Sequence, residues 1–402
     1  MKQKILIISV FLCFLFILTG CWNRKELNDI AITVALGIDK SGDQYSISAQ
    51  IVNPGETAAK AAGGKGAPVT TYTEKADTVF EALRKMTKKS PRILYLSHVR
   101  IVVFGEKFAR KEGIGKSLDF LSRDREMRTD FALLVAKGVR AEKILQVYTL
   151  PQEVIPANKI FKSLQTSEKV WAATAIVTLD EVISDIVSEG KQPAITGIEL
   201  TGEKEKEEVQ TKKNVDKISP ISSLRIADVA IFKKDKLVGW LNEDESKGFQ
   251  YITGNVKSTV GTVSCPNGGK LALEVIRTKS ELKGNVINGR PTVNVKVRVE
   301  ANVGDVECEI DLSKTENIYK LEKLGAKKVK GYMEKSVKKA KENKTDIFGF
   351  GEAIHRSNPK AWKEMKNDWD KQFSGLKVNI AVDYKIRRLG TITKSFQDKL
   401  KE

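Results

Sequence analysis

Residues 293–303 read VNVKVRVEANV, with an apolar side chain at every second position and a polar or charged one in between. Because successive side chains of a β-strand point to opposite faces, this alternation predicts a strand with one buried face and one solvated face. Gly304 and Asp305 follow, and residues 306–312 then alternate again, with Cys308 on the apolar face. Glycine next to aspartate is typical of a turn, so the two runs predict an antiparallel hairpin.

The same two-residue period returns in residues 376–386, near the end of the chain. Between these runs, residues 315–343 carry apolar side chains at a spacing of three and four, which predicts one long helix. A helix of this length extends over roughly 43 Å. We therefore expect a C-terminal antiparallel sheet packed against long helices.

The N-terminal half contains both the two-residue period of strands and the three-to-four-residue spacing of helices. Residues 30–38 and 45–51 predict a hairpin, and the helix that begins near residue 79, with Phe80 on its apolar face, has Asp77 in position to cap it. The further expected elements are strands at 96–104 and 131–136 and helices at 114–121, 141–147, 158–165 and 179–187. The fold class that follows is a multidomain α+β protein with mostly antiparallel sheets flanked by helices.

A chain of 402 residues is too long for one ordinary domain. Residues 201–217 contain five acidic, five basic and only two apolar residues, so they predict an exposed connection between domains or a long loop. The expected division is a leader at 1–20, an N-terminal α+β region of one or two subdomains at 21–200, the charged segment at 201–217 and a C-terminal α+β domain at 218–402.

The first residues are typical of an export signal. Lys2 and Lys4 precede residues 5–18, an apolar run that Ser9 alone interrupts. Such a run suits a signal peptide, whereas a membrane-spanning helix needs about 17–25 apolar residues. The sequence then reads LTGC at residues 18–21, which matches a bacterial lipobox. This match implies removal of residues 1–20 and a diacylglyceryl thioether on Cys21, whose two acyl chains give stable anchoring.

Two cysteines remain after Cys13 leaves with the leader and Cys21 is acylated. Cys265 and Cys308 can form one disulfide. The alternating apolar face around Cys308 also suits a small buried hydrophobic residue, and this is the interpretation that we favour.

Several stretches resemble the Ger(x)C family, the C-subunit lipoproteins of bacterial spore germinant receptors. These are CWNRKELND at 21–29 with ALGID at 35–39, HVRIVVFG at 98–105, LDFLSRDREMR at 118–128, and DIFGFG at 346–351 followed by Pro359, Trp362 and Trp369. The resemblance extends over essentially the whole mature chain, and it depends on the order and spacing of these stretches together.

The resemblance implies a non-catalytic subunit of a nutrient receptor that acts in spore germination. It implies two integral-membrane partners, an A subunit and a transporter-like B subunit, and a location on the extracytoplasmic face of the inner spore membrane. No cofactor or metal is implied. The fold that it implies, sheets flanked by helices, agrees with the pattern described above.

Three groups of residues are candidates for contact with a partner or the membrane. Arg123, Asp124 and Arg128 belong to a cluster of five charges in six residues, in which Asp124 and Arg128 are four apart and would pair on a helix. We weigh a solvated or domain-packing ion network, which we favour, against a partner contact.

Trp362 and Trp369 are seven apart on a predicted helix, which places them on one face as core residues or as interface anchors. The long helix carries a stripe of lysines that includes Lys327 and Lys338, and such a stripe attracts anionic lipid headgroups. The alternative, an ordinary solvated helix face, is the one we favour.

The net charge of +18 raises the question of nucleic acid, but the export signal and the lack of aromatic residues among the lysines argue against it. With two histidines, no His-Glu-x-x-His and no Gly-x-Ser-x-Gly, the sequence also argues against an enzyme. Two alternatives to the receptor subunit stay open: a substrate-binding lipoprotein of an importer, and a secreted hydrolase. An importer protein would be built from parallel βαβ units around an interlobe cleft, and a hydrolase would show carboxylates clustered in a pocket.

Overall fold

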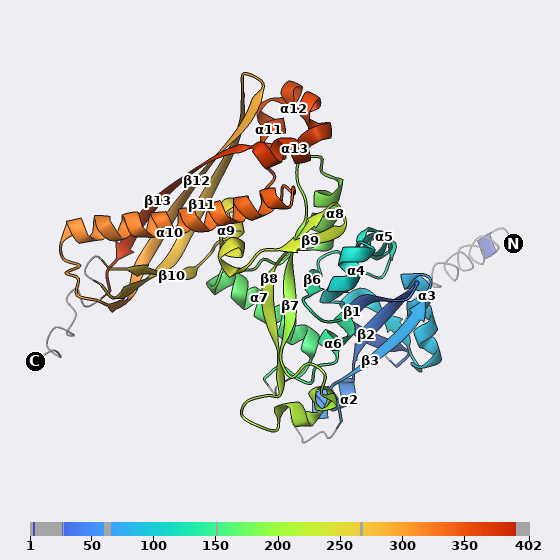
Figure 1. Cartoon of the computed structure of the whole chain (residues 1–402). Coiled ribbons are helices and arrows are strands. Elements are labelled where there is room, and N and C mark those ends of the chain that lie inside the picture. The colour runs from blue at the N-terminus through green and yellow to red at the C-terminus, as the bar shows by residue number, and fades with distance from the viewer. Residues whose placement is uncertain are drawn as a thin grey trace, which may run out of the picture.

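The computed structural model describes residues 3–4, 26, 28–59, 66–149, 152–265 and 268–390. Two sheets lie toward opposite ends of an elongated molecule, and helices flank both of them (Figure 1). The predicted α+β class is confirmed. Cys21 and, apart from residues 3–4, the expected leader lie outside the described residues. No helix in the described part of the chain is long and apolar enough to cross a bilayer.

The larger sheet has nine strands in the order β3-β2-β1-β5-β6-β7-β8-β9, with β4 paired to the beginning of β1. Strands β1, β5, β6 and β7 run parallel, and the flanking strands on both sides are antiparallel. The expected hairpin at 30–51 is confirmed as β1 with β2. The strands are β1 (Ile30–Ser41), β2 (Gln44–Val52), β3 (Val69–Ala76), β4 (Ile93–Tyr95), β5 (Ile101–Gly105), β6 (Ala132–Ala136), β7 (Ala194–Gly202), β8 (Ser222–Lys233) and β9 (Lys236–Trp240).

Helices cover both faces of this sheet. Val102 and Phe104 of β5 pack with α3, α4, α5 and α8, whereas Ile101 and Val103 pack with α6 and α7 on the other face. Burial on both faces explains why this strand reads as a continuous apolar run. The helices are α2 (Pro54–Ala59), α3 (Val79–Lys85), α4 (Glu106–Lys111), α5 (Gly115–Arg123), α6 (Ala141–Leu145), α7 (Pro156–Val170) and α8 (Leu179–Val187), with 3₁₀ turns η2 (Met86–Lys88) and η3 (Leu96–His98).

Two local predictions in this half are wrong. The strand expected at 96–104 begins only at Ile101, because η3 occupies the preceding residues. The cap of α3 is Thr78 and not Asp77: the Thr78 hydroxyl accepts a hydrogen bond from the backbone N–H of Glu81 at 3.1 Å. A hydroxyl directly before the first helical residue reaches that N–H better than a carboxylate one residue earlier.

Residues 201–217 consist of the last two residues of β7 and most of the loop that joins β7 to its antiparallel neighbour β8 in the large sheet. The loop contains η4 (Glu207–Gln210) and η5 (Lys212–Val215), and it is ordered by two buried side chains, Val209 and Asn214. The Asn214 side chain accepts the N–H of Ser222 at 2.9 Å and donates to the carbonyl of Tyr148 at 2.8 Å. Strands β8 and β9 thus extend the large sheet, although they lie within residues 218–402, the expected C-terminal domain.

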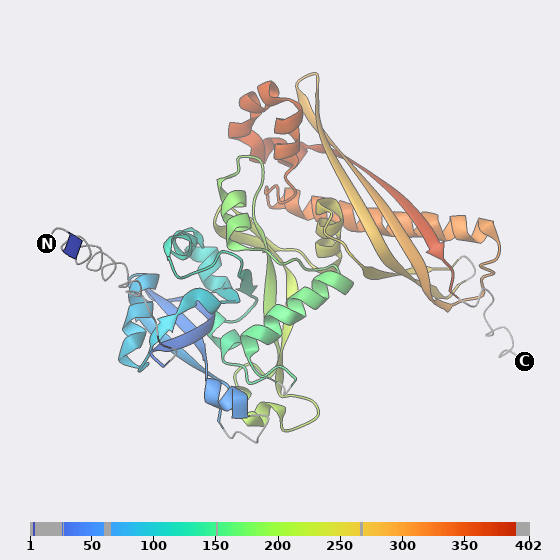
Figure 2. The ribbon, with the colours of Figure 1, turned by 180° about the vertical axis from the view of Figure 1, so that it is seen from behind.

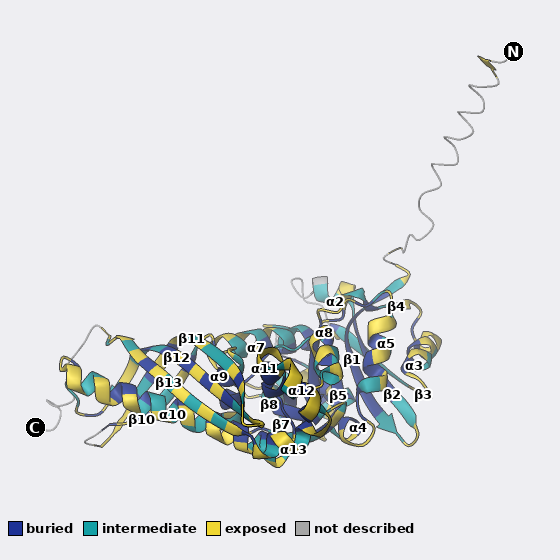
Figure 3. Ribbon diagram, turned by 90° about the horizontal axis from the view of Figure 1, so that it is seen from above, coloured by how far each residue is buried: buried dark blue, intermediate teal, exposed yellow. Residues whose placement is uncertain are grey.

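The C-terminal sheet has the order β10-β11-β12-β13. Its strands are β10 (Thr259–Ser264), β11 (Lys270–Ile287), β12 (Arg290–Glu307) and β13 (Lys377–Arg388), and its helices are α9 (Glu243–Thr253) and the long α10 (Thr315–Glu342). The alternation at 293–303 is confirmed as part of β12, whose valines pack with Met333 and Val337 of α10. From behind, α10 is seen to lie along one face of this sheet (Figure 2). Buried and exposed residues alternate along the strands (Figure 3).

The expected turn at Gly304 and Asp305 is wrong, because β12 continues through it. Val303 pairs with Leu273 and Asp305 with Ala272, so Gly304 is a bulge in an uninterrupted ladder. The hairpin turn is instead Asn288–Gly289, between β11 and β12, where both residues have positive φ. Asn-Gly is the preferred pair for a two-residue hairpin turn.

Strand β13 runs parallel to β12, so the C-terminal sheet is mixed and not antiparallel throughout. The connection between these strands contains α10 and three short helices, α11 (Phe350–Ser357), α12 (Pro359–Met365) and α13 (Trp369–Gly375). A parallel pair requires such a crossover, whereas a hairpin suffices for an antiparallel pair.

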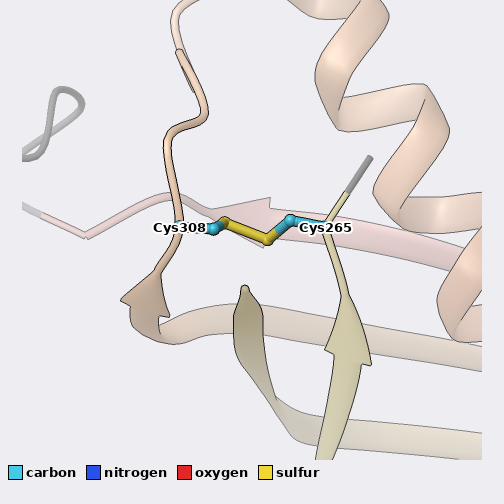
Figure 4. Close-up of a disulfide and its surroundings, with 2 residues drawn as sticks. All are labelled: Cys265 and Cys308. Carbon is cyan, nitrogen blue, oxygen red and sulfur yellow. A yellow bond between two sulfur atoms is a disulfide. The ribbon is translucent and has the colours of Figure 1, made fainter. Parts of the chain in front are cut away.

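A disulfide joins Cys265, directly after β10, to Cys308, directly after β12 (Figure 4). The favoured interpretation of Cys308 as an unbridged hydrophobic residue is therefore wrong, although both cysteines are buried as it required. The alternation at Cys308 could not reveal the bond, because its partner comes from a strand 43 residues earlier in the chain.

Candidate functional site

A groove of about 860 Å³ opens between α3, β4 with η3, and the end of α5. We call it the α3–α5 groove. Its lining residues are Phe80, Leu83, Arg84, Thr87, Ile93, Leu94, Tyr95, Leu96, Ser97, Phe120, Arg123, Asp124, Arg125 and Glu126. The lining includes Phe120 and residues 123–126 from the stretch at 118–128, and residues 93–97, which directly precede the stretch at 98–105.

Two large apolar side chains at this groove are exposed to solvent. Phe80 is 48% exposed and Ile93 is 54% exposed, although their sequence neighbours Val79 and Leu94 are buried. The Phe80 ring contacts the Phe120 ring at 5.9 Å between centroids, and the Arg84 guanidinium lies 5.0 Å from the centre of the Phe80 ring. An exposed apolar pair beside a groove is typical of a contact surface.

The predicted ion pair between Asp124 and Arg128 is wrong, because α5 ends at Arg123 and the two residues are not on one helix. Arg123 pairs with Asp119 at 2.8 Å, and this hydrogen bond holds the pKa of the Asp119 carboxyl below its usual value. Asp124 instead accepts the backbone N–H of Glu126 at 2.8 Å and so orders the turn after the helix.

Arg128 lies next to the groove and not in its lining, and it pairs with Asp130 at 2.7 Å. The turn that precedes it is tied to η3, because the Ser97 hydroxyl donates to the Glu126 carbonyl at 2.7 Å. The charged cluster is therefore largely a set of local pairs that shapes the rim of the groove.

The groove adjoins the first described strand of the chain. Strand β4 pairs with the beginning of β1, Ile30 opposite Ile93, and the Ile93 N–H donates to the Asp29 carbonyl at 3.0 Å. Ile30 is only nine positions after Cys21 in the sequence. An extended segment of that length spans roughly 30 Å.

Trp362 and Trp369 lie elsewhere, among α11, α12 and α13 near the far sheet. They belong to consecutive helices and not to one, their rings meet edge to face at 5.2 Å, and both are buried. The two tryptophans are therefore core residues of this part of the chain and not exposed interface anchors.

A buried carboxylate that the sequence analysis did not single out organises this cluster. Asp346 accepts four backbone N–H groups, from residues 348–351, and the indole N–H of Trp369 at 3.0 Å. Burial raises the pKa of Asp346 to about 6, although the hydrogen bonds from Gly351, Phe350, Trp369 and Phe348 lower it. The stretch at 346–351 is thus a helix-starting anion nest, and the glycines that follow an aspartate were the available signal.

Lys327 and Lys338 are exposed on α10, as a solvated stripe requires. Other lysines of this helix are held within the chain: Lys335 pairs with Asp244 at 2.6 Å, and Lys328 donates to the Thr262 carbonyl. The predicted site residues therefore fall in three separate places, and only Arg123 and Asp124 line the α3–α5 groove.

The described residues contain no group of three or more histidine, cysteine or acidic side chains that could hold a metal ion. In the groove, the Asp124 carboxylate is held in its turn by the backbone N–H of Glu126. That the protein is not an enzyme stays a prediction.

Two family models match the chain. The model described as the spore germination protein N-terminal domain matches residues 23–200, and the model described as spore germination B3/GerAC-like, C-terminal, matches residues 227–390. The chain belongs to the GerAC-like family of spore germination proteins. The resemblance stated from the sequence is confirmed.

The relatives of this GerAC-like chain match it along nearly its whole length. Spore germination protein KC of Bacillus subtilis is 33% identical over 397 residues, which cover 97% of each chain. Spore germination protein B3 of the same bacterium is 23% identical and covers 96% of this chain and 98% of its own. The crystal structure of the GerBC protein is 21% identical, with a TM-score of 0.53, and covers 87% of this chain and 96% of that one. At this identity the likeness to GerBC shows the fold.

Proposed function

We propose that this GerAC-like protein is the lipid-anchored, non-catalytic C subunit of a nutrient germinant receptor. It sits on the extracytoplasmic face of the inner spore membrane beside an integral-membrane A subunit and a transporter-like B subunit. The observation that carries the proposal is the match of both halves of the chain to one family of spore germination proteins.

The anchor is the diacylglyceryl group on Cys21, which the lipobox supports. Two acyl chains hold a protein to a bilayer for long periods, and the short segment from Cys21 to β1 keeps the N-terminal sheet near the surface. A disulfide in the folded domain is compatible with an oxidising location outside the cytoplasm.

The test is nutrient-triggered germination of spores that carry Cys21→Ala at the native locus, beside a deletion strain. We expect both to lose the response to the cognate nutrient, measured as the fall in optical density. Cys13→Ala is the matched control, because it changes a cysteine of the leader that is outside the lipobox, and these spores should germinate like the wild type. A normal response in both the deletion and the Cys21→Ala strain would refute the proposal.

The partners are tested separately by purifying the tagged chain from spore membranes in mild detergent. The A and B subunits should accompany the wild-type chain. Their absence from a preparation that contains intact, lipidated protein would contradict the receptor role.

A further inference from the structure

One surface of the molecule combines exposed apolar side chains with positive charges that pair with no carboxylate of the described residues, and it is joined by β4 to the strand that begins nine positions after Cys21 in the sequence. It consists of five exposed residues on α3, η2, β4 and the turn before β4: Phe80, Arg84, Lys88, Arg92 and Ile93. We call it the Phe80–Ile93 patch. We propose that this patch rests on the anionic lipid surface to which Cys21 is anchored and so fixes the orientation of the protein; the proposal rests on the lipid anchor of the proposed function.

The apolar part of the patch is suited to the boundary between headgroups and acyl chains. Phe80 and Ile93 leave about half of their surface uncovered and line the α3–α5 groove from two sides. Aromatic and aliphatic side chains that insert a short way into this boundary are typical of proteins that lie on a membrane. Burial there would remove from water the apolar area that the fold leaves open.

The charged part of the patch is free to meet phosphate. Neighbouring lysines are already paired, Lys85 with Glu81 at 2.8 Å and Lys89 with Glu74 at 2.6 Å. Among the described residues, no carboxylate pairs with Arg84, Lys88 or Arg92. Arg84 also lies over the Phe80 ring, which holds its charge beside the apolar surface.

Position distinguishes this patch from other basic surfaces. It shares β4 with the groove, and β4 is hydrogen-bonded to the chain just before β1, within nine residues of Cys21. The lysines of α10 lie at the opposite end of the molecule (Figures 1 and 3). A basic residue close to an anionic surface strengthens binding roughly five-fold. Arg84, Lys88 and Arg92 together should therefore raise the affinity for anionic lipid about 100-fold.

The experiment uses the chain from residue 21 with Cys21→Ala, so that binding does not depend on the acyl chains. All contacts reported above involve residues beyond 26, so this protein keeps them. Sedimentation with vesicles of phosphatidylcholine containing 30% phosphatidylglycerol gives the lipid affinity, and vesicles of phosphatidylcholine alone show its dependence on charge. Two variants test the patch: R84Q/K88Q/R92Q for charge and F80S/I93S for apolar contact.

The matched control is K323Q/K327Q/K338Q, which removes three exposed lysines from α10. We expect the patch charge variant to bind the anionic vesicles about 100-fold more weakly, F80S/I93S to bind at least ten-fold more weakly, and the α10 variant to stay within about two-fold of the parent protein. Circular dichroism melting of all variants verifies that they are folded.

The proposal is overturned if the parent protein does not bind the anionic vesicles, if both patch variants bind like the parent, or if the α10 variant is the one that loses binding. If the patch variants keep vesicle binding but no longer co-purify with the receptor partners, the patch is a protein contact and the lipid proposal is wrong. None of these results bears on Cys21, because the germination test of Cys21→Ala decides the proposed function separately.

Discussion

Removal of the disulfide between Cys265 and Cys308 is predicted to weaken the C-terminal domain strongly. The bond closes a loop across a sequence separation of 43 residues, and the two Cα atoms are 6.4 Å apart, within the normal range for a disulfide. In the chain-entropy model, a loop of this size restricts the unfolded chain by about 4 kcal/mol at 25 °C. The double variant C265A/C308A should lose about that much free energy of unfolding, plus a smaller contribution from lost sulfur packing.

Urea unfolding followed by tryptophan fluorescence measures this loss, since two tryptophans lie in the core of the C-terminal domain. Reduced wild-type protein is the control, because it keeps both sulfur atoms and loses only the cross-link. It should approach the double variant, and the double variant should not respond to reductant. Equal unfolding midpoints for oxidised wild type, reduced wild type and double variant would show that the cross-link does not stabilise the domain.

Three further predictions concern single residues, each measured by urea unfolding. Asp346→Ala leaves five buried donors without an acceptor and should lower the free energy of unfolding by about 4 kcal/mol. Asp346→Asn keeps the oxygen that accepts three of these hydrogen bonds, so it should cost about half as much. Equal losses for the two variants would contradict this role of Asp346. Burial raises the pKa of the Glu106 carboxyl, but three hydrogen bonds outweigh burial and hold the pKa below its usual 4.5. The charged carboxylate therefore stabilises the fold above pH 4.5, and this contribution is lost as the pH falls through the folded-state pKa. Glu106→Gln should show a smaller loss of stability than the wild type between pH 5 and pH 3, and an equal loss would show that Glu106 does not contribute to the pH dependence. A Cβ at Gly248 of α9 would lie 2.1 Å from the Tyr332 carbonyl oxygen of α10, so Gly248→Ala should destabilise the protein by about 3 kcal/mol. A Cβ at Gly331 has no heavy atom within 4 Å, so Gly331→Ala should stabilise the protein by about 0.5–1 kcal/mol. Stability changes of the same sign for both variants would contradict close packing of the two helices.

The sequence reveals the fold where one pattern runs unbroken. The valines of β12 alternate over eleven residues, and the structure has that strand at those positions. Its partner β11 was missed because a bulge between Val275 and Arg277 breaks the alternation and leaves Ile276 exposed. A bulge reverses the face of every later side chain, so a strict two-residue period cannot detect such a strand. The Asn288–Gly289 pair was the local signal that could have located the hairpin.

The candidate site was predictable only in part, because it depends on what the fold leaves uncovered. Arg123 and Asp124 do line the groove, and the motif around them was recognised. Phe80 was assigned to the apolar face of its helix, since periodicity cannot distinguish a core position from an exposed one at the edge of the same face. Ile93 belongs to β4, whose pairing with the beginning of β1 is a tertiary contact that no local sequence pattern contains.

The lipid anchor at Cys21 can be checked by the intact mass and the N-terminal peptide of the protein purified from spore membranes. We expect a chain that begins at Cys21 and carries a diacylglyceryl group on its sulfur. A chain that retains residues 1–20 and has a free thiol at Cys21 would contradict both the anchor and the membrane orientation built on it.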